Sequence, residues 1–170
     1  MLHGAFAALL SLLSVGAAAQ SPPDFECSNE AVPPTTPSSD FTLVGDGSIV
    51  RHESTGLEWQ RCSFGQTWDG TTCQGDPTGR VWGDALQVAA ELGDGWRIPN
   101  INELASIVEL CTGSSLNRAV FPNTPTATWF WSSTTFVHDP EQAWAIPFGN
   151  GTEQTSLKAS FNYRLRFVRD

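Results

Sequence analysis

The residues best suited to chemistry in this sequence are aromatic and cationic, and they indicate binding rather than catalysis. Tryptophan rings offer an apolar face and a polar edge to a sugar. Trp129 shares a predicted strand with Trp131, and we expect one ring to face the core and Trp129 to face solvent. Arg164 and Arg166 alternate with apolar residues, so we expect them to point outward together, about 7 Å apart. We therefore predict a ligand surface formed by Trp129, Arg164 and Arg166; the alternative is that both arginines pair with the domain's own carboxylates.

Catalytic motifs are scarce. After the first twenty residues the sequence has two histidines, His52 and His138, with no Gly-x-Ser-x-Gly elbow, no histidine pair spaced for a metal and no glycine-rich phosphate loop. We predict a protein that is not an enzyme and has no cofactor. Calcium is the alternative, because five side chains offer the oxygen ligands that it prefers, although their spacing matches no calcium loop. These are Asp46, Asp69, Asn100, Asn102 and Glu103.

Residues 1–19 are predicted to form a signal peptide. Residues 5–15 are an apolar run too short to span a bilayer of about 30 Å, and residues 17–19 supply small side chains for cleavage. We expect export to the periplasm, the cell surface or the medium. No later segment is apolar enough to predict a transmembrane helix.

The charge of the chain limits its partners. The formal net charge is −9 and there is a single lysine. Nucleic acid and anionic lipid are disfavoured as partners, because they require clustered lysine and arginine. The oligomeric state is left open.

Four cysteines follow the predicted signal peptide: Cys27, Cys62, Cys73 and Cys111. An even number in an exported chain implies disulfides, with three alternative connectivities. Residues 63–72 are rich in turn formers, so we expect a Cys62–Cys73 bond and, with the remaining pair, Cys27–Cys111. A zinc site would require a tighter grouping of cysteine and histidine.

The remaining chain is predicted to be an arm followed by one domain. Residues 20–40 are rich in proline, serine and threonine, which is typical of an extended linker. Residues 41–170 have a globular composition, and we assign them to a single domain. Short apolar and alternating runs predict strands at residues 41–44, 49–52, 57–60, 128–134, 143–148 and 161–167.

Two helices are predicted between these strands. Residues 82–92 carry apolar side chains at helical spacing, and Gly93 can end that helix. Asn100 and Glu103 have the spacing of a capping box, and apolar residues then share one face up to Cys111. The predicted fold class is therefore α+β, a disulfide-stapled domain with short antiparallel strands around two helices.

Several short phrases occur in an order that resembles the Lcl C-terminal domain family. They are TGLEW at 55–59, RC at 61–62, GQTWDG at 65–70, GWRIPN at 95–100, NEL at 102–104, VFPNTP at 120–125 and FWSS at 130–133. The resemblance covers residues 40–170 and implies an exported or envelope-associated bacterial domain. The family is named for a collagen-like adhesin that binds sulfated polysaccharides, whereas this chain lacks collagen-like repeats and is acidic.

A second resemblance concerns residues 96–104, which are similar to a segment of the formylglycine-generating enzyme group. That group is a variant of the C-type lectin fold, so the resemblance implies a C-type-lectin-like architecture. The enzyme's chemistry needs a cysteine pair late in the chain, and no cysteine follows Cys111 here.

Together these observations predict a secreted or envelope-associated recognition domain that binds glycan or cell-surface ligands without catalysis. The alternative is a structural or protein-interaction domain of the cell envelope that has no sugar site. For most of the seven tryptophans, packing in the core is the favoured interpretation.

Overall fold

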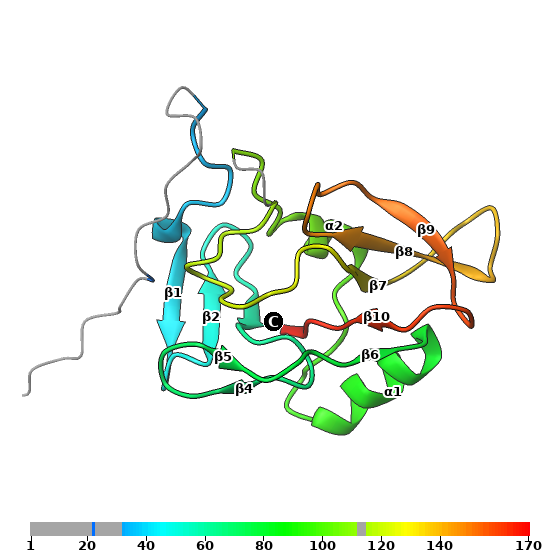
Figure 1. Cartoon of the computed structure of the whole chain (residues 1–170), viewed down its shortest axis with the longest axis horizontal. Coiled ribbons are helices and arrows are strands. Elements are labelled where there is room, and N and C mark those ends of the chain that lie inside the picture. The colour runs from blue at the N-terminus through cyan, green and yellow to red at the C-terminus, as the bar shows by residue number, and fades with distance from the viewer. Residues whose placement is uncertain (1–21, 23–31, 112–114) are drawn as a thin grey trace, which may run out of the picture.

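The computed structural model describes residues 22, 32–111 and 115–170, and β-strands dominate this part of the chain. Eleven strands form a four-stranded sheet, a five-stranded sheet and a two-stranded ribbon (Figure 1). No helix among the described residues is long and apolar enough to cross a membrane.

The four-stranded sheet is antiparallel and has the order β1-β2-β3-β11. Its strands are β1 (Phe41–Val44), β2 (Ile49–His52), β3 (Glu58–Gln60) and β11 (Val168–Arg169). A short 3-10 helix, η1 (Ser38–Asp40), leads into β1. The turn between β1 and β2 contains Gly45 and Gly47, whose φ angles of 60° and 81° favour glycine. The predicted strands at 41–44 and 49–52 are confirmed.

The five-stranded sheet has the order β6-β10-β7-β8-β9, in which β10 runs parallel to β7 and the other pairs are antiparallel. Its strands are β6 (Gly79–Arg80), β7 (Trp129–Thr135), β8 (Gln142–Pro147), β9 (Gln154–Leu157) and β10 (Tyr163–Arg164). Most of β7 and β8 was predicted, because both are aromatic-rich runs.

The two-stranded ribbon consists of β4 (Thr67–Trp68) and β5 (Cys73–Gln74). A disulfide with an S–S distance of 2.09 Å joins Cys62 to Cys73, the pairing expected from the turn-rich loop between them. Cys27 lies outside the described residues, so its bond to Cys111 stays a prediction.

The first helix agrees with the sequence pattern. Helix α1 (Trp82–Leu92) buries Ala85 and Ala89 in the same cluster as residues of the five-stranded sheet. Gly93 follows it with a φ of 69°, which an L side chain rarely adopts.

The second helix starts as predicted but ends early. Helix α2 (Ile101–Ala105) begins with the predicted capping box, in which the Asn100 side chain accepts from the Glu103 main-chain N–H and the Glu103 carboxylate accepts from Asn100 N–H. The Ser106 hydroxyl donates to the Glu103 carbonyl at 2.7 Å, which competes with continued helical bonding. The prediction that this helix reaches Cys111 is wrong.

The chain after α2 is held by a buried carboxylate instead. Glu109 accepts hydrogen bonds from the main-chain N–H groups of Thr35 (3.0 Å), Thr36 (2.8 Å) and Cys111 (2.8 Å). Burial raises the pKa of Glu109, but these hydrogen bonds outweigh that effect and the net pKa is lowered. The last part of the predicted arm is therefore docked on the domain.

The predicted fold class, an α+β domain of short antiparallel strands around two helices, is wrong, whereas the C-type-lectin-like architecture stays a prediction. The described part of the chain is mainly β, with one helix of 11 residues and a second of 5. Five strands are only two residues long. Strands this short have no detectable alternation, and three of them, β6, β10 and β11, pair only with segments that are distant in the sequence.

The C-terminal segment connects the two larger sheets. It supplies β10 to the five-stranded sheet and, four residues later, β11 to the four-stranded sheet, near the centre of the molecule (Figure 1). Leu165, Arg166 and Phe167 lie between these strands and are buried. The predicted single strand at 161–167 with an exposed basic face is therefore wrong.

Candidate functional site

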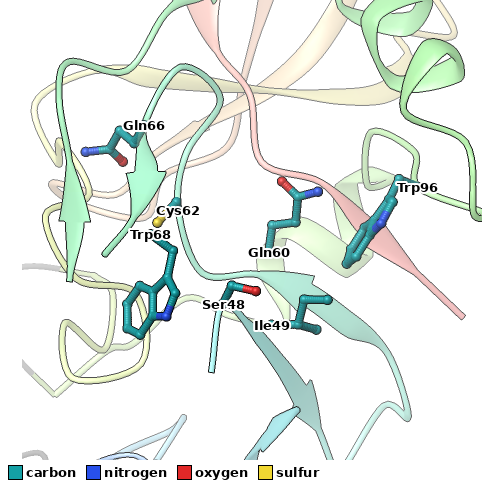
Figure 2. Close-up of a pocket in the computed structure, with 7 residues that line it drawn as sticks. All are labelled: Ser48, Ile49, Gln60, Cys62, Gln66, Trp68 and Trp96. Atoms are coloured by element: carbon teal, nitrogen blue, oxygen red, sulfur yellow. The ribbon is translucent and has the colours of Figure 1, made fainter. Parts of the chain in front are cut away.

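A pocket of about 230 Å³ lies where the beginning of β2, the end of β3 and the two-stranded ribbon meet the loop after α1 (Figure 2). The side chains that line it are all uncharged. They are Ser48, Ile49, Gln60, Cys62, Gln66, Trp68 and Trp96. Two half-buried indoles and two amides in one pocket make it the best candidate for a ligand site among the described residues.

Trp68 reaches the pocket from β4, within the loop that the Cys62–Cys73 disulfide closes. Its indole N–H donates to the Asp46 carbonyl at 3.2 Å. The guanidinium carbon of Arg61 lies 4.4 Å from the ring centroid, a cation–π contact. These contacts fix the orientation of the ring.

Arg61 is itself buried and anchored by main-chain groups. Its Nε donates to the Val120 carbonyl at 2.7 Å, Nη1 to Gly47 at 2.8 Å and Nη2 to Ala119 at 3.0 Å. Burial lowers the pKa of Arg61. Arg61 thus serves as a rigid support for Trp68, with its nitrogens occupied by carbonyl oxygens.

Trp96 reaches the pocket from the loop that follows α1. Asp94 and Gly95 have positive φ angles of 51° and 78° in this loop, and a tight turn presents the indole to the pocket. The guanidinium carbon of Arg169 lies 4.5 Å from the Trp96 ring centroid. Arg169 also donates to the Glu58 carboxylate at 2.7 Å and 2.8 Å, so its charge is neutralised.

The polar groups of the pocket differ in availability. The Gln66 amide is occupied, because it accepts from Ser63 N–H and donates to the carbonyls of Gly75 and Asn123. Gln60 lies between the two indoles in Figure 2, and its side chain makes no hydrogen bond within the described ranges. A ligand can therefore bind the Gln60 amide without breaking an existing bond.

Arg166, a residue of the predicted ligand surface, does not face solvent. Its side chain is fully buried, and burial lowers its pKa to about 9. It donates to the carbonyls of Gln60 (2.8 Å) and Arg61 (2.7 Å) and to Thr124 Oγ1 (2.6 Å). Because the side chain is buried, the prediction that Arg166 binds a ligand at the surface is wrong. The alternative of a carboxylate partner is wrong as well, because no ion pair to Arg166 exists in the described part of the chain. Arg166 instead fixes the main chain on which Gln60 sits.

Arg164 and Trp129 are not brought together with the pocket. Arg164 is half-buried on β10, opposite Phe130, and it does not share an exposed face with Arg166. Trp129 is half-buried. Its ring stacks on the Tyr163 ring with centroids 5.9 Å apart, and the Trp131 ring also contacts the Tyr163 ring, with centroids 4.5 Å apart. The expectation that the two tryptophans face opposite sides is wrong, because residues two apart in a strand share a face. A ligand role for Arg164 or Trp129 stays a prediction.

Four of the five candidate calcium ligands serve local structure, since Asn100 and Glu103 form the capping box of α2 and the other two are Asp46 and Asp69. Asp46 accepts from the Ser48 main chain at 3.0 Å, and Asp69 accepts from Thr71 and Thr72, both at 2.8 Å. In residues 32–111 and 115–170 no group of three or more acidic, histidine or cysteine side chains is placed to hold a metal ion.

The pocket residues Gln60, Trp68 and Trp96 were not selected from the sequence. The two tryptophans share one signal in the sequence, since each has glycine and aspartate as near neighbours, in residues 65–70 and 93–96, where a large aromatic residue has little core to fill. That local context distinguishes them from Trp59 and Trp131, which are fully buried.

Comparison with known proteins gives the family of the chain. No curated protein matches it. The model of the Lcl C-terminal domain matches residues 48–169, a segment that contains the whole pocket. Since this match covers well over half of the sequence, the chain belongs to the Lcl C-terminal domain family.

Proposed function

We propose that this protein is an exported glycan-recognition domain without catalytic activity, and that it binds sugar in the pocket between Trp68 and Trp96. Family membership points to an exported bacterial domain. The observation that carries the proposal is that two indoles from separate loops line one pocket, each supported by an arginine.

The rigidity of these indoles supports a recognition role. Sugar rings stack their C–H faces on aromatic rings, and a pre-ordered ring loses little entropy on binding. The two arginine contacts, the disulfide around Trp68 and the glycine-containing turn before Trp96 all restrict the rings before a ligand arrives.

A glycan array tests this proposal against the alternative of an envelope domain with no sugar site. We expect the wild-type domain to bind a defined set of glycans and the Trp68→Ala and Trp96→Ala variants to lose that binding. Phe161→Ala is the matched control, because Phe161 is an aromatic side chain that is 44% exposed and does not line the pocket. If no glycan on the array binds the wild-type domain, or if all variants bind equally, the structural alternative is favoured.

A further inference from the structure

We propose that the pocket binds a single neutral pyranose residue, and that the Gln60 amide recognises two adjacent hydroxyl groups on it. This inference rests on the proposed function and names its ligand class. Three features of the pocket carry it: its size, the absence of charge on its lining, and the distribution of free hydrogen-bonding groups.

The size of the pocket limits how much ligand it can enclose. Its volume of about 230 Å³ is below the range of roughly 300–1,000 Å³ of sites for drug-sized ligands. One sugar ring fits that space, and further residues of a longer glycan would extend into solvent.

The electrostatics of the site favour a neutral ligand. All the side chains that line it are uncharged. Recognition of a carboxylate or sulfate normally uses a guanidinium fork, but the two nearby guanidinium groups are already engaged. Arg61 donates to three main-chain carbonyls, and Arg169 is paired with Glu58. The net charge of −9 adds a general repulsion toward polyanions.

The free polar groups determine which hydroxyl pattern is recognised. Ser48 Oγ donates its hydrogen to Asp46 at 2.6 Å, and Gln66 is fully engaged. The Gln60 amide keeps an acceptor oxygen and donor N–H groups side by side. Two adjacent hydroxyl groups can satisfy both, because each hydroxyl can donate and accept. A carboxylate or sulfate only accepts, so it would leave the amide oxygen of Gln60 without a donor.

The floor of the pocket holds this amide in place. Arg166 donates to the carbonyls of Gln60 and Arg61 from the buried side, and Gln60 pairs with Ile49 across β2 and β3. Gln60 therefore projects from a fixed main chain, as a specificity-determining residue requires.

The test uses methyl glycosides of glucose, galactose and mannose, together with their uronic acid and 6-sulfate analogues, titrated into the whole protein and followed by ligand-observed NMR. We expect at least one neutral glycoside to bind and its charged analogues to bind at least about tenfold more weakly, because the pocket lining offers no charge to pair with the anionic group and the chain carries a net charge of −9. Gln60→Leu and the similarly sized Gln60→Met should each weaken binding of the neutral glycoside about tenfold or more. Gln154→Leu is the control, because Gln154 is exposed and outside the pocket.

Three outcomes would overturn the inference. They are tighter binding of a uronic acid or sulfate, an unchanged affinity in both folded Gln60 variants, and binding only to oligosaccharides. If Trp68→Ala abolishes binding of those charged or longer glycans, the proposed function still stands and only the ligand class is wrong. If no glycan binds at all, both proposals fail.

Discussion

The guanidinium carbon of Arg61 lies 4.4 Å from the centroid of the Trp68 ring, which joins a buried cation to the wall of the candidate site. Arg61 also holds two distant segments together, since it donates to Gly47 after β1 and to Ala119 and Val120 before β7. The same side chain therefore supports both the fold and the orientation of a pocket residue.

Replacement of Arg61 by methionine should lower the free energy of unfolding by about 3 kcal/mol, because three main-chain carbonyls lose their donor. Urea denaturation measures this change. Arg51→Met is the control: Arg51 is exposed and its nearest carboxylate oxygen, on Glu58, is 4.0 Å away, so its effect should stay within about 0.5 kcal/mol. Equal effects of the two substitutions would contradict the supporting role of Arg61.

Removal of the Cys62–Cys73 disulfide should loosen the ribbon that carries Trp68. The bond spans a sequence separation of 11 residues, so the Cys62→Ser/Cys73→Ser double variant should lose about 3 kcal/mol of stability. Relative to the wild-type domain, hydrogen exchange in this variant should accelerate more in residues 63–72 than in β7 or β8. Uniform loss of protection across the domain would show that the disulfide supports more than this ribbon.

Arg164 and Arg166 should differ sharply in their contributions to the free energy of unfolding. Arg166→Leu should cost about 3 kcal/mol, because the carbonyls of Gln60 and Arg61 and the Thr124 hydroxyl lose a buried donor. Arg164→Leu should change the free energy of unfolding by less than about 0.5 kcal/mol. Thermal and urea unfolding of both variants check this, and a larger effect at Arg164 would contradict the structure.

Stability should also depend on the protonation of His52. This imidazole is buried and stacks on Phe41 with ring centroids 4.6 Å apart. Desolvation lowers its pKa below the usual value of 6.5, while the charges of Asp40 and Glu53 act in the opposite direction. Below about pH 6.5, His52 of the unfolded chain binds a proton more readily than His52 of the folded domain. The free energy of unfolding is therefore retained above pH 6.5, and it falls as the pH decreases toward the pKa of His52 in the folded domain.

The variant His52→Phe should flatten the pH dependence of the free energy of unfolding below about pH 6.5. His138→Gln is the control, because His138 is exposed and should leave the slope unchanged. A slope that survives in His52→Phe would assign the pH dependence to other groups.

Some elements could be predicted from the sequence because local chemistry determines them. Helix α1 has its apolar residues at helical spacing and a glycine at its end, and the start of α2 is set by the Asn100–Glu103 capping box. The short turn-rich loop likewise identified the Cys62–Cys73 pair. In each case the partners are close together in the chain.

The burial of Arg166 could not be predicted in that way. Residues 161–167 alternate like one half-buried strand, but the chain leaves the five-stranded sheet after Arg164 and enters the four-stranded sheet at Val168. Alternation gives a side chain's direction only while a strand continues. The pocket was missed for a related reason, since Gln60, Trp68 and Trp96 meet only in the folded domain.

The most direct test of the binding site is an NMR titration that follows the indole N–H signals of the seven tryptophans, assigned by single Trp→Phe variants, while a glycan selected on the array is added. We predict that the signals of Trp68 and Trp96 shift with the same dissociation constant and that those of the buried Trp59 and Trp131 stay in place. Shifts at Trp129 with no change at Trp68 or Trp96 would contradict the account, because they would place the ligand outside the pocket.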